Sequence, residues 1–171
     1  MPITAVLVLV FGRGVPAGQP AGTPTPSAGS GASTGAVGLA PLPVDPPPAS
    51  AAADRACPPM LAALPTRLRD RPLRPVRTSS AFVVAWGEPP VVLRCGVPRP
   101  AAFKVGSANL VQINDVNWFV QEQGQRDLWT AVDRSVYVEL SVPADEHSAP
   151  AAVLSPVLAR TLTERPMSPA N

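Results

Sequence analysis

The side chains most often used for catalysis and metal binding are scarce in this chain of 171 residues, which has two cysteines and one histidine. A structural zinc site needs about four converging ligands, and a Ser-His-acid triad needs three groups brought together from different elements. The histidine, His147, instead has Asp145, Glu146 and Ser148 beside it in the sequence, which is typical of a surface loop. We therefore predict no metal, no cofactor and no catalytic role for His147.

Carboxylates are the other groups that could carry chemistry, because glycoside hydrolysis uses two of them facing each other across a cleft. The phosphate-binding motifs GxGxxG and GxxxxGK(S/T) are absent from the sequence. No pattern pairs the acidic residues, so no catalytic residue is predicted, and a hydrolase stays open as the alternative to a non-catalytic protein. The candidates by residue type are Glu88, Asp115, Glu122, Asp127 and Glu139.

The two cysteines lie on segments that we expect to pack together. Cys95 belongs to an apolar run with a period of two, in which Val91 and Leu93 point to the same side, the pattern of a half-buried strand. Prolines border this run on both sides and end its ladder. Cys57 heads a short apolar segment upstream, and a disulfide between Cys57 and Cys95 would stabilise the fold by about 4 kcal/mol. A reactive thiol is the weaker alternative, since no CxxC is present.

Five arginines gather between the two cysteines, in the stretch RLRDRPLRPVR at residues 67–77, which we call the arginine segment. It has no aromatic side chain to stack on bases, and the formal net charge of the chain is only +2, so a nucleic-acid partner is not expected. We interpret the segment as a solvated loop, with contact to anionic headgroups, wall polymers or an acidic protein face as the functional alternative. Its arginines are Arg67, Arg69, Arg71, Arg74 and Arg77.

Helices are predicted at the two ends of the folded part. Pro58 and Pro59 suit the first turn of a short helix that ends at Pro65 and has Cys57 at its N-terminus. Near the C-terminus, apolar residues recur at helical spacing behind a serine that can cap the helix. The residues of this second pattern are Leu154, Val157, Leu158, Thr161 and Leu162, with Ser148 or Ser155 as the cap.

Four more strands are predicted after Cys95, and the short polar turns between them are typical of an antiparallel meander. Trp129 is predicted to point inward, opposite Val138, and Trp86 and Trp118 to belong to the core. The predicted fold class is α+β: a small antiparallel sheet of four to five strands with a short N-terminal helix and a C-terminal helix, tied by one disulfide. The four strands cover residues 110–113, 116–122, 127–132 and 135–142.

The N-terminal third differs from the rest in composition. Residues 3–11 are apolar but fall short of the roughly 20 that a bilayer-spanning helix needs, and no basic residue precedes them. We therefore interpret residues 1–12 as a partial export signal or a truncated membrane anchor. Residues 13–53 are rich in Pro, Gly and Ala and have no aromatic residue, which predicts a disordered linker. The folded domain is predicted over residues 54–165, followed by a disordered tail at 166–171.

Four blocks of the sequence, in order, resemble the actinobacterial family named domain of unknown function 3515: ACPPMLAALP, AWGEPPVVLRCGVPRPAAF, NDVNWF and VDRSVYVELSVP. The resemblance implies an exported or membrane-anchored envelope protein, and it brings no activity and no catalytic residues. We therefore expect a monomeric, non-catalytic interaction or accessory module outside the cytoplasmic membrane, secreted or membrane-anchored. Its partner would be an unknown envelope component, either a protein, an anionic lipid or a wall polymer. The alternative is a small hydrolase acting on cell-wall material.

Overall fold

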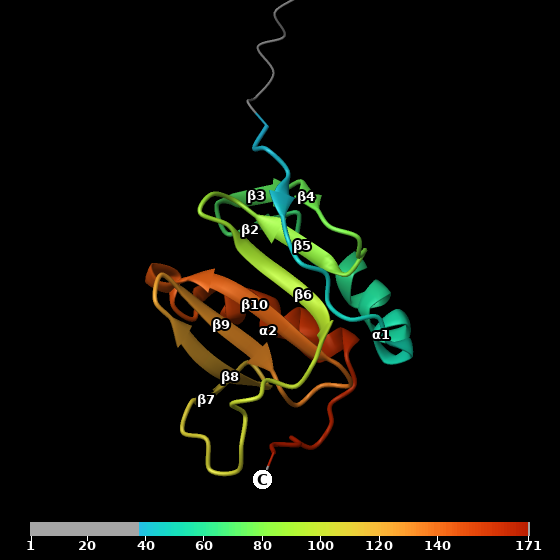
Figure 1. The fold of residues 1–171 in the computed structure, drawn as a ribbon, viewed down its shortest axis with the longest axis vertical. Helices are drawn as coiled ribbons and strands as arrows, with labels where there is room; N and C mark the ends of the chain where they lie inside the picture. Colours follow the sequence, from blue (N-terminus) through green and yellow to red (C-terminus); the bar gives the residue numbers. More distant parts are fainter. Residues whose placement is uncertain (1–37, 171) are drawn as a thin grey trace, which may run out of the picture. The chain divides into compact units, whose positions relative to one another are not determined.

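The computed structural model describes residues 38–170, which form an α+β fold on one large antiparallel sheet. The sheet has eight strands in the order β2-β3-β5-β6-β10-β9-β8-β7 (Figure 1). A separate parallel pair joins β1 (Leu42–Pro43) to β4 (Val76–Arg77). The eight strands are β2 (Arg67–Leu68), β3 (Arg71–Arg74), β5 (Val83–Trp86), β6 (Val91–Val97), β7 (Leu110–Ile113), β8 (Val116–Gln123), β9 (Arg126–Ala131) and β10 (Tyr137–Pro143).

The prediction of four to five strands is wrong, because the sheet continues into the arginine segment and through β5. β3 reads RPLR, and none of its residues is fully buried, so it lacks the alternation of apolar residues that marks a strand. Side-chain ion pairs hold this end of the sheet. The interpretation of the arginine segment as a solvated loop is also wrong, because the segment contains the strands β2, β3 and β4. The later strands confirm the predicted meander.

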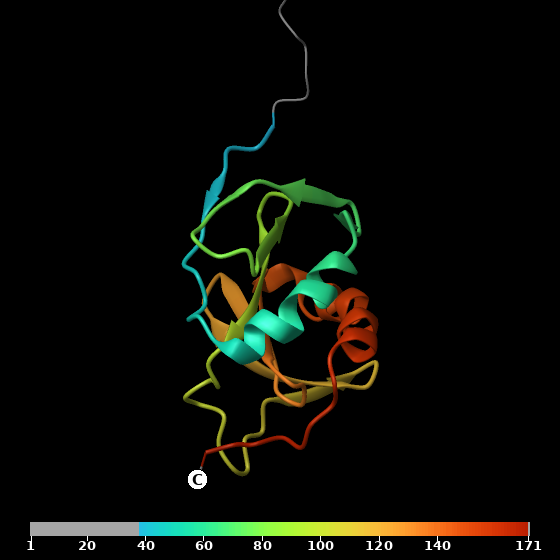
Figure 2. The same ribbon diagram turned by 90° about the vertical axis from the view of Figure 1, so that its right-hand side faces the viewer.

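Both helices lie over one face of the sheet, and segment 38–48 runs over the opposite face (Figure 2). The helices are α1 (Ala51–Ala62) and α2 (Ala149–Thr161), and a short 3-10 turn, Ala144–Glu146, precedes α2. The main core between helices and sheet contains Trp86 and Trp118, both fully buried as predicted. Trp86 donates its indole N–H to the carbonyl of Pro65 at 3.0 Å, and Trp118 donates its own to Ser155 Oγ at 2.9 Å.

Helix α1 begins earlier than predicted, at Ala51, because Ser50 caps it: Ser50 Oγ accepts a hydrogen bond from the backbone N–H of Ala53 at 3.1 Å. Pro58 and Pro59 therefore lie inside the helix instead of in its first turn, and Cys57 lies at mid-helix. Because proline has no backbone N–H, the carbonyls four residues before each proline lack their usual helical donors. Both carbonyls belong to exposed residues, where water can bond to them. The prediction of Cys57 at the helix N-terminus is wrong for this reason.

The disulfide between Cys57 and Cys95 ties α1 to β6, as predicted, with the two Cα atoms 5.9 Å apart. Next to it, Gly96 has a φ of +85° and forms a bulge in β6, where the pairing with β10 shifts by one residue. A Cβ atom on Gly96 would lie 2.5 Å from the Cβ of Ala53. Glycine at this position thus lets α1 approach the sheet closely enough for the disulfide to form.

Trp129 points into the core as predicted, with 6% of its surface exposed, but it lies opposite Leu140 and not Val138. The connection between β9 and β10 is longer than the sequence suggested, because its backbone bonds elsewhere. The N–H of Val132 donates to Asn117 at 2.9 Å, and that of Ser135 donates to Thr163 at 2.8 Å. These bonds remove two residues from the ladder, which shifts the register by two and keeps Trp129 on the same face.

Ordered structure also extends beyond the predicted domain boundaries. The N–H groups of Leu42 and Val44 donate to the carbonyls of Pro75 and Arg77, so part of the predicted linker is a strand. At the other end, Ala170 exchanges backbone hydrogen bonds with residues 103 and 105, so the predicted disordered tail pairs with a loop. The predicted signal or anchor at 1–12, and the linker up to residue 37, lie outside the described residues. Among residues 38–170, neither helix is long and apolar enough to cross a bilayer.

Candidate functional site

The face of the sheet turned away from the helices carries polar side chains in registered rows. Apolar clusters border these rows on both sides, one under segment 38–48 and one around Phe103 and Phe119. No helix covers the rows. Arg94, Glu139, Ser141 and Leu128 are partly exposed there, whereas Thr130 and Val92 are buried. Two neighbouring rows cross β6, β10 and β9: Arg94, Glu139 and Thr130, then Val92, Ser141 and Leu128.

A groove of about 440 Å³ crosses these rows, and we call it the open-face groove. Segment 42–45 supplies one wall, and strands β6, β8, β9 and β10 supply the floor and the other wall. The lining combines apolar side chains with two arginines and two carboxylates. Its residues are Leu42, Pro43, Val44, Asp45, Pro90, Val92, Arg94, Gln123, Arg126, Leu128, Glu139 and Ser141.

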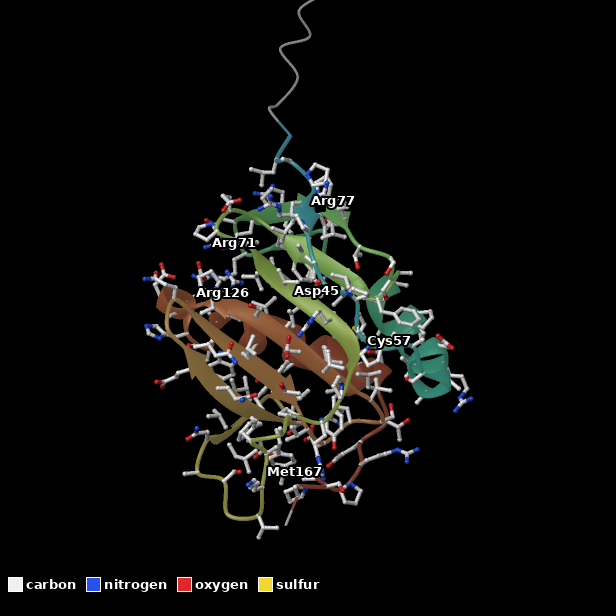
Figure 3. The ribbon with its side chains drawn as sticks, viewed as in Figure 1. Asp45, Cys57, Arg71, Arg77, Arg126 and Met167 are labelled. Atoms are coloured by element: carbon white, nitrogen blue, oxygen red, sulfur yellow. A yellow bond between two sulfur atoms is a disulfide. The ribbon has the colours of Figure 1, made fainter. Side chains whose placement is uncertain are left out.

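Arg126 lies at one end of the open-face groove and is fixed there by neutral acceptors (Figure 3). Its Nε donates to Ser141 Oγ at 2.8 Å, and its Nη2 donates to the carbonyls of Ser141 at 2.8 Å and Pro90 at 2.6 Å. Within residues 38–170, no carboxylate lies within ion-pair distance of Arg126, and its Nη1 makes no hydrogen bond. The guanidinium is thus held in one orientation with two N–H donors left over.

Partial burial lowers the pKa of Arg126 from its ordinary value, and the negative charge of Glu88 acts in the opposite direction. The group nevertheless stays protonated at physiological pH, because an arginine pKa starts far above it. Arg126 therefore presents a positive charge that has lost part of its water and has no ionic partner. A carboxylate or another anion bound in the groove would supply that partner.

The other charges of the groove lie apart from Arg126. Arg94 donates from Nε and Nη2 to the same oxygen, Glu139 Oε1, at 3.0 and 2.6 Å, and so neutralises that carboxylate. Glu139 pairs with Thr130, four residues along β9 from Arg126, which corresponds to about 13 Å. Asp45 lies on the wall formed by the N-terminal segment (Figure 3). The row of Val92, Ser141 and Leu128 thus lies between the end of the groove that holds Arg126 and the end that holds the Arg94–Glu139 ion pair.

The arginine segment does not form a common contact surface. Arg71 pairs with Glu146 and also donates to the carbonyl of Pro89. Arg74 has a side chain only 6% exposed, pairs with Glu88 at 2.5 Å and donates to the carbonyls of Gly87 and Ala40. Two of the five candidate contact residues thus hold β3 against the β5–β6 turn and the turn before α2, and both charges are neutralised there.

The other three arginines of the segment, Arg67, Arg69 and Arg77, are exposed. Arg67 donates to the carbonyl of Asp70 at 2.8 Å, and Arg69 reaches Glu146 at 3.5 Å. Sequence reasoning missed Arg126, because a single arginine after a Gly-Gln turn has no signature. Only its register on the open face and its lack of a carboxylate partner distinguish it.

The acidic residues suggested by type do not face each other across a cleft. Glu88 and Glu139 are engaged in ion pairs, and Asp115 lies in the tight turn between β7 and β8. Glu122 and Asp127 are neighbours on adjacent strands, side by side on one face of the sheet. Among residues 38–170, no group of three His, Cys, Asp or Glu residues is placed to hold a metal ion. His147 is exposed in its loop.

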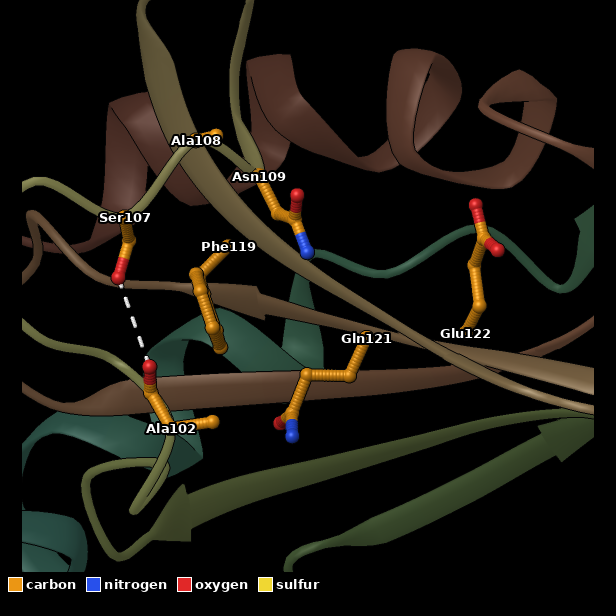
Figure 4. Close-up of a pocket in the computed structure, with 7 residues that line it drawn as sticks. All are labelled: Ala102, Ser107, Ala108, Asn109, Phe119, Gln121 and Glu122. Atoms are coloured by element: carbon orange, nitrogen blue, oxygen red, sulfur yellow. Dashed lines mark hydrogen bonds between the residues drawn. The ribbon is translucent and has the colours of Figure 1, made fainter.

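A second hollow on the open face, of about 480 Å³, lies beside Phe119 under the 102–109 loop (Figure 4). Its polar lining is neutral except for Glu122. The hydroxyl of Ser107 is already bonded within the loop, to the carbonyls of Lys104 at 2.7 Å and Ala102 at 3.4 Å. The open-face groove is the stronger candidate, because its charge without an ionic partner, that of Arg126, is held in one orientation by three hydrogen bonds.

Comparison with known proteins gives one match. A family model described as "Protein of unknown function (DUF3515)" matches residues 28–167, which include every helix and strand described above. No curated protein and no solved structure matches the chain.

Proposed function

The chain belongs to the DUF3515 family, and we propose that it is a non-catalytic binding module outside the cytoplasmic membrane, whose open-face groove receives an extended acidic segment of a partner protein. The disulfide supports the location, because such bonds persist in oxidising compartments and are rare in the cytosol. Secretion or anchoring in the cell envelope, with an envelope protein as the partner, completes the proposal.

The observation that carries the proposal is Arg126. Three hydrogen bonds to neutral oxygens fix its guanidinium, so a ligand carboxylate would find it already oriented. Hydrogen bonds between a guanidinium and a carboxylate are among the stronger polar contacts, and partial burial strengthens them. A purely structural arginine, such as Arg74, is instead paired with a carboxylate of its own chain.

The shape and lining of the groove favour a peptide segment. Apolar side chains from the wall and the floor, among them Leu42, Val44 and Leu128, provide contacts for alternate side chains of an extended chain. Residues 1–37 contain no Asp or Glu, so the segment that precedes the groove wall in this chain offers no carboxylate for Arg126. This composition favours an acidic segment that belongs to another molecule.

Titration of the full, oxidised protein with the peptide acetyl-Val-Glu-Val-Glu-Val-Glu-amide tests the proposal. Arginine Nε–H signals, observed by ¹⁵N-resolved NMR, should show a saturable shift for Arg126. The glutamine peptide acetyl-Val-Gln-Val-Gln-Val-Gln-amide is the control for the ligand. An Arg126→Gln variant should lose binding, while an Arg67→Gln variant, changed at an exposed arginine outside the groove, should bind as the parent does.

Equal shifts with both peptides, or no shift of the Arg126 signal in the parent protein, would contradict the proposal. Both observations use the unaltered chain and so do not depend on how a variant folds. A third outcome is that anionic phospholipid vesicles bind the Arg126→Gln variant as well as the parent, while the peptide binds neither protein. In that case the binding surface is the exposed arginines and the ligand is a lipid surface.

A further inference from the structure

The two edges of the main sheet differ in the features that protect an edge strand from pairing. Strand β2 at one edge is only two residues long and begins with Arg67, and β3 beside it contains Pro72. Short strands, charged side chains and proline are common means of blocking an edge. Strand β7 at the other edge is four residues long, reads LVQI and has neither charge nor proline (Figure 1). It is an unprotected edge, and its Val111 is 41% exposed.

The backbone of β7 leaves donors and acceptors free at this edge. The carbonyl of Asn109 accepts the N–H of Val120 at 2.9 Å, so the backbone groups of Asn109 face β8. Because successive residues of a strand direct these groups to opposite sides, Val111 also faces β8, whereas Leu110 and Gln112 face outward. Within residues 38–170, the outward N–H and carbonyl groups of Leu110 and Gln112 have no hydrogen-bond partner. An added strand would complete these bonds.

We propose that β7 pairs antiparallel with β7 of a second copy of this chain, so that two eight-stranded sheets join edge to edge about a two-fold axis. The axis crosses the sheet at Val111, which lies opposite Val111 of the partner subunit. Leu110 of each copy then exchanges both backbone hydrogen bonds with the partner's Gln112. An axis at Gln112 would instead place Leu110 opposite the turn residue Asn114 and lose this exchange. The resulting dimer replaces the monomer expected from the sequence.

The side chains of β7 suit a second copy. Opposite residues of an antiparallel pair share a face, so the two Val111 side chains meet on the helix face with their Cβ atoms about 5 Å apart. On the open face, Leu110 lies beside the partner's Gln112. Since β7 contains no charged residue, the two-fold axis brings no like charges of this strand together.

The segments on either side of β7 are complementary in charge. Antiparallel pairing brings the turn after β7 of one copy beside the loop before β7 of the other. The turn carries Asp115, and the loop, residues 102–109, carries Lys104 and no acidic residue. Both residues are exposed, and within residues 38–170 neither forms an ion pair. Opposite charges thus approach each other at both ends of the joined strands, which favours a second copy over an unrelated strand.

Cross-linking of cysteine variants tests this register. Val111→Cys should give a disulfide-linked dimer on a non-reducing gel, because opposite residues of a pair without hydrogen bonds have Cα atoms about 4.5 Å apart, within reach of a disulfide. Val153→Cys is the matched control, since Val153 lies on α2 and is 40% exposed, and it should remain monomeric on the gel. Gln112→Cys should cross-link more slowly than Val111→Cys, because its two copies are two residues out of register.

Sedimentation equilibrium of the full, oxidised protein should show a monomer–dimer equilibrium between micromolar and millimolar concentration. Val111→Lys places two positive charges opposite each other at the axis and should weaken association at least about tenfold, whereas Val153→Lys should leave it unchanged. Gln112→Pro should also weaken it about tenfold, because the N–H that it removes faces outward and not toward β8.

A parent protein that stays monomeric over this range would overturn the inference, as would equal behaviour of the Val111 and Val153 variants. Faster cross-linking by Gln112→Cys than by Val111→Cys would contradict it as well. If a chain starting at residue 38 dimerises and the full chain does not, residues 1–37 cover the edge in place of a second copy. Arg126→Gln should dimerise as the parent does, so this result stands or falls separately from the peptide-binding proposal.

Discussion

Arg74 and Arg126 show how two regions of one sheet use the same residue type differently. Arg74, at the edge formed by the arginine segment, is 6% exposed and has a carboxylate partner at 2.5 Å in Glu88. Arg126, in the open-face groove, is partly buried and donates only to neutral oxygens. The first arginine completes the fold, whereas the second leaves a positive charge that a ligand can neutralise. The number of arginines in a segment is thus a poorer guide to binding than the partners each one has.

The disulfide supports both regions, and removing it should have the largest effect. Cys57→Ala with Cys95→Ala should lower the free energy of unfolding by about 4 kcal/mol, because the bond closes a long loop in the unfolded chain. Urea unfolding followed by tryptophan fluorescence measures the change. A loss confined to the arginine-segment edge in amide exchange, with the groove unaffected, would show that the two regions are separate folding units.

Removing residues 38–53 should have the next largest effect and should damage both regions. The truncated protein loses the Ser50 cap with the first turn of α1, the backbone hydrogen bonds of Leu42 and Val44, and the Ala40 carbonyl that accepts from Arg74. We expect a loss of about 3 kcal/mol from one cap and two apolar side chains, together with the loss of peptide binding. A chain starting at residue 38 is the control. If the two melt at the same temperature, segment 38–53 does not pack on the domain.

Replacing each of the two arginines by methionine sharpens the comparison. Arg74→Met should destabilise by about 2 kcal/mol, because it removes an ion pair to an exposed carboxylate and leaves two carbonyls without a donor. Arg126→Met should change stability by no more than about 1 kcal/mol, since the lost hydrogen bonds are offset by removal of a partly buried charge without an ionic partner. Equal losses in thermal or urea unfolding would show that Arg126 is as structural as Arg74.

The exposed arginines should have the smallest effect. Changing Arg67, Arg69 and Arg77 together to glutamine should alter stability by less than about 0.5 kcal/mol, as surface substitutions usually do. Binding of the acidic peptide should stay within about twofold of the parent, because separate surface charges add little to a contact made elsewhere. A tenfold loss of peptide affinity, measured by calorimetry, would show that the arginine segment is the contact site.

Prediction from sequence succeeded where burial determines the pattern. The alternation of apolar residues around Cys95 and along 136–142 predicted β6 and β10, and a single cysteine pair predicted the disulfide. It failed where polar contacts determine the structure. β3 is held by the ion pairs of Arg71 and Arg74, and α1 extends to Ala51 because Ser50 caps it. Neither kind of contact produces a periodic pattern of apolar residues in the sequence.

The candidate sites were beyond sequence reasoning for a related reason. Arg126 stands out because it is partly buried and yet has no carboxylate partner, and Glu122 and Asp127 meet only through the register of β8 and β9. Trp129 was correctly predicted to point inward, but its unbonded N–H depends on the lengths and directions of neighbouring side chains. Such properties arise from the whole fold and not from the spacing of residues along the chain.

A charge exchange at Arg126 tests the central claim most directly. Calorimetry would compare the parent and Arg126→Glu, each titrated with acetyl-Val-Glu-Val-Glu-Val-Glu-amide and with the corresponding lysine peptide. The account predicts that the parent prefers the acidic peptide, and that Arg126→Glu loses this peptide and prefers the lysine peptide by at least about tenfold, as expected when a partly buried charge partner is reversed. An unchanged preference in a folded Arg126→Glu protein, or no preference in the parent, would contradict it.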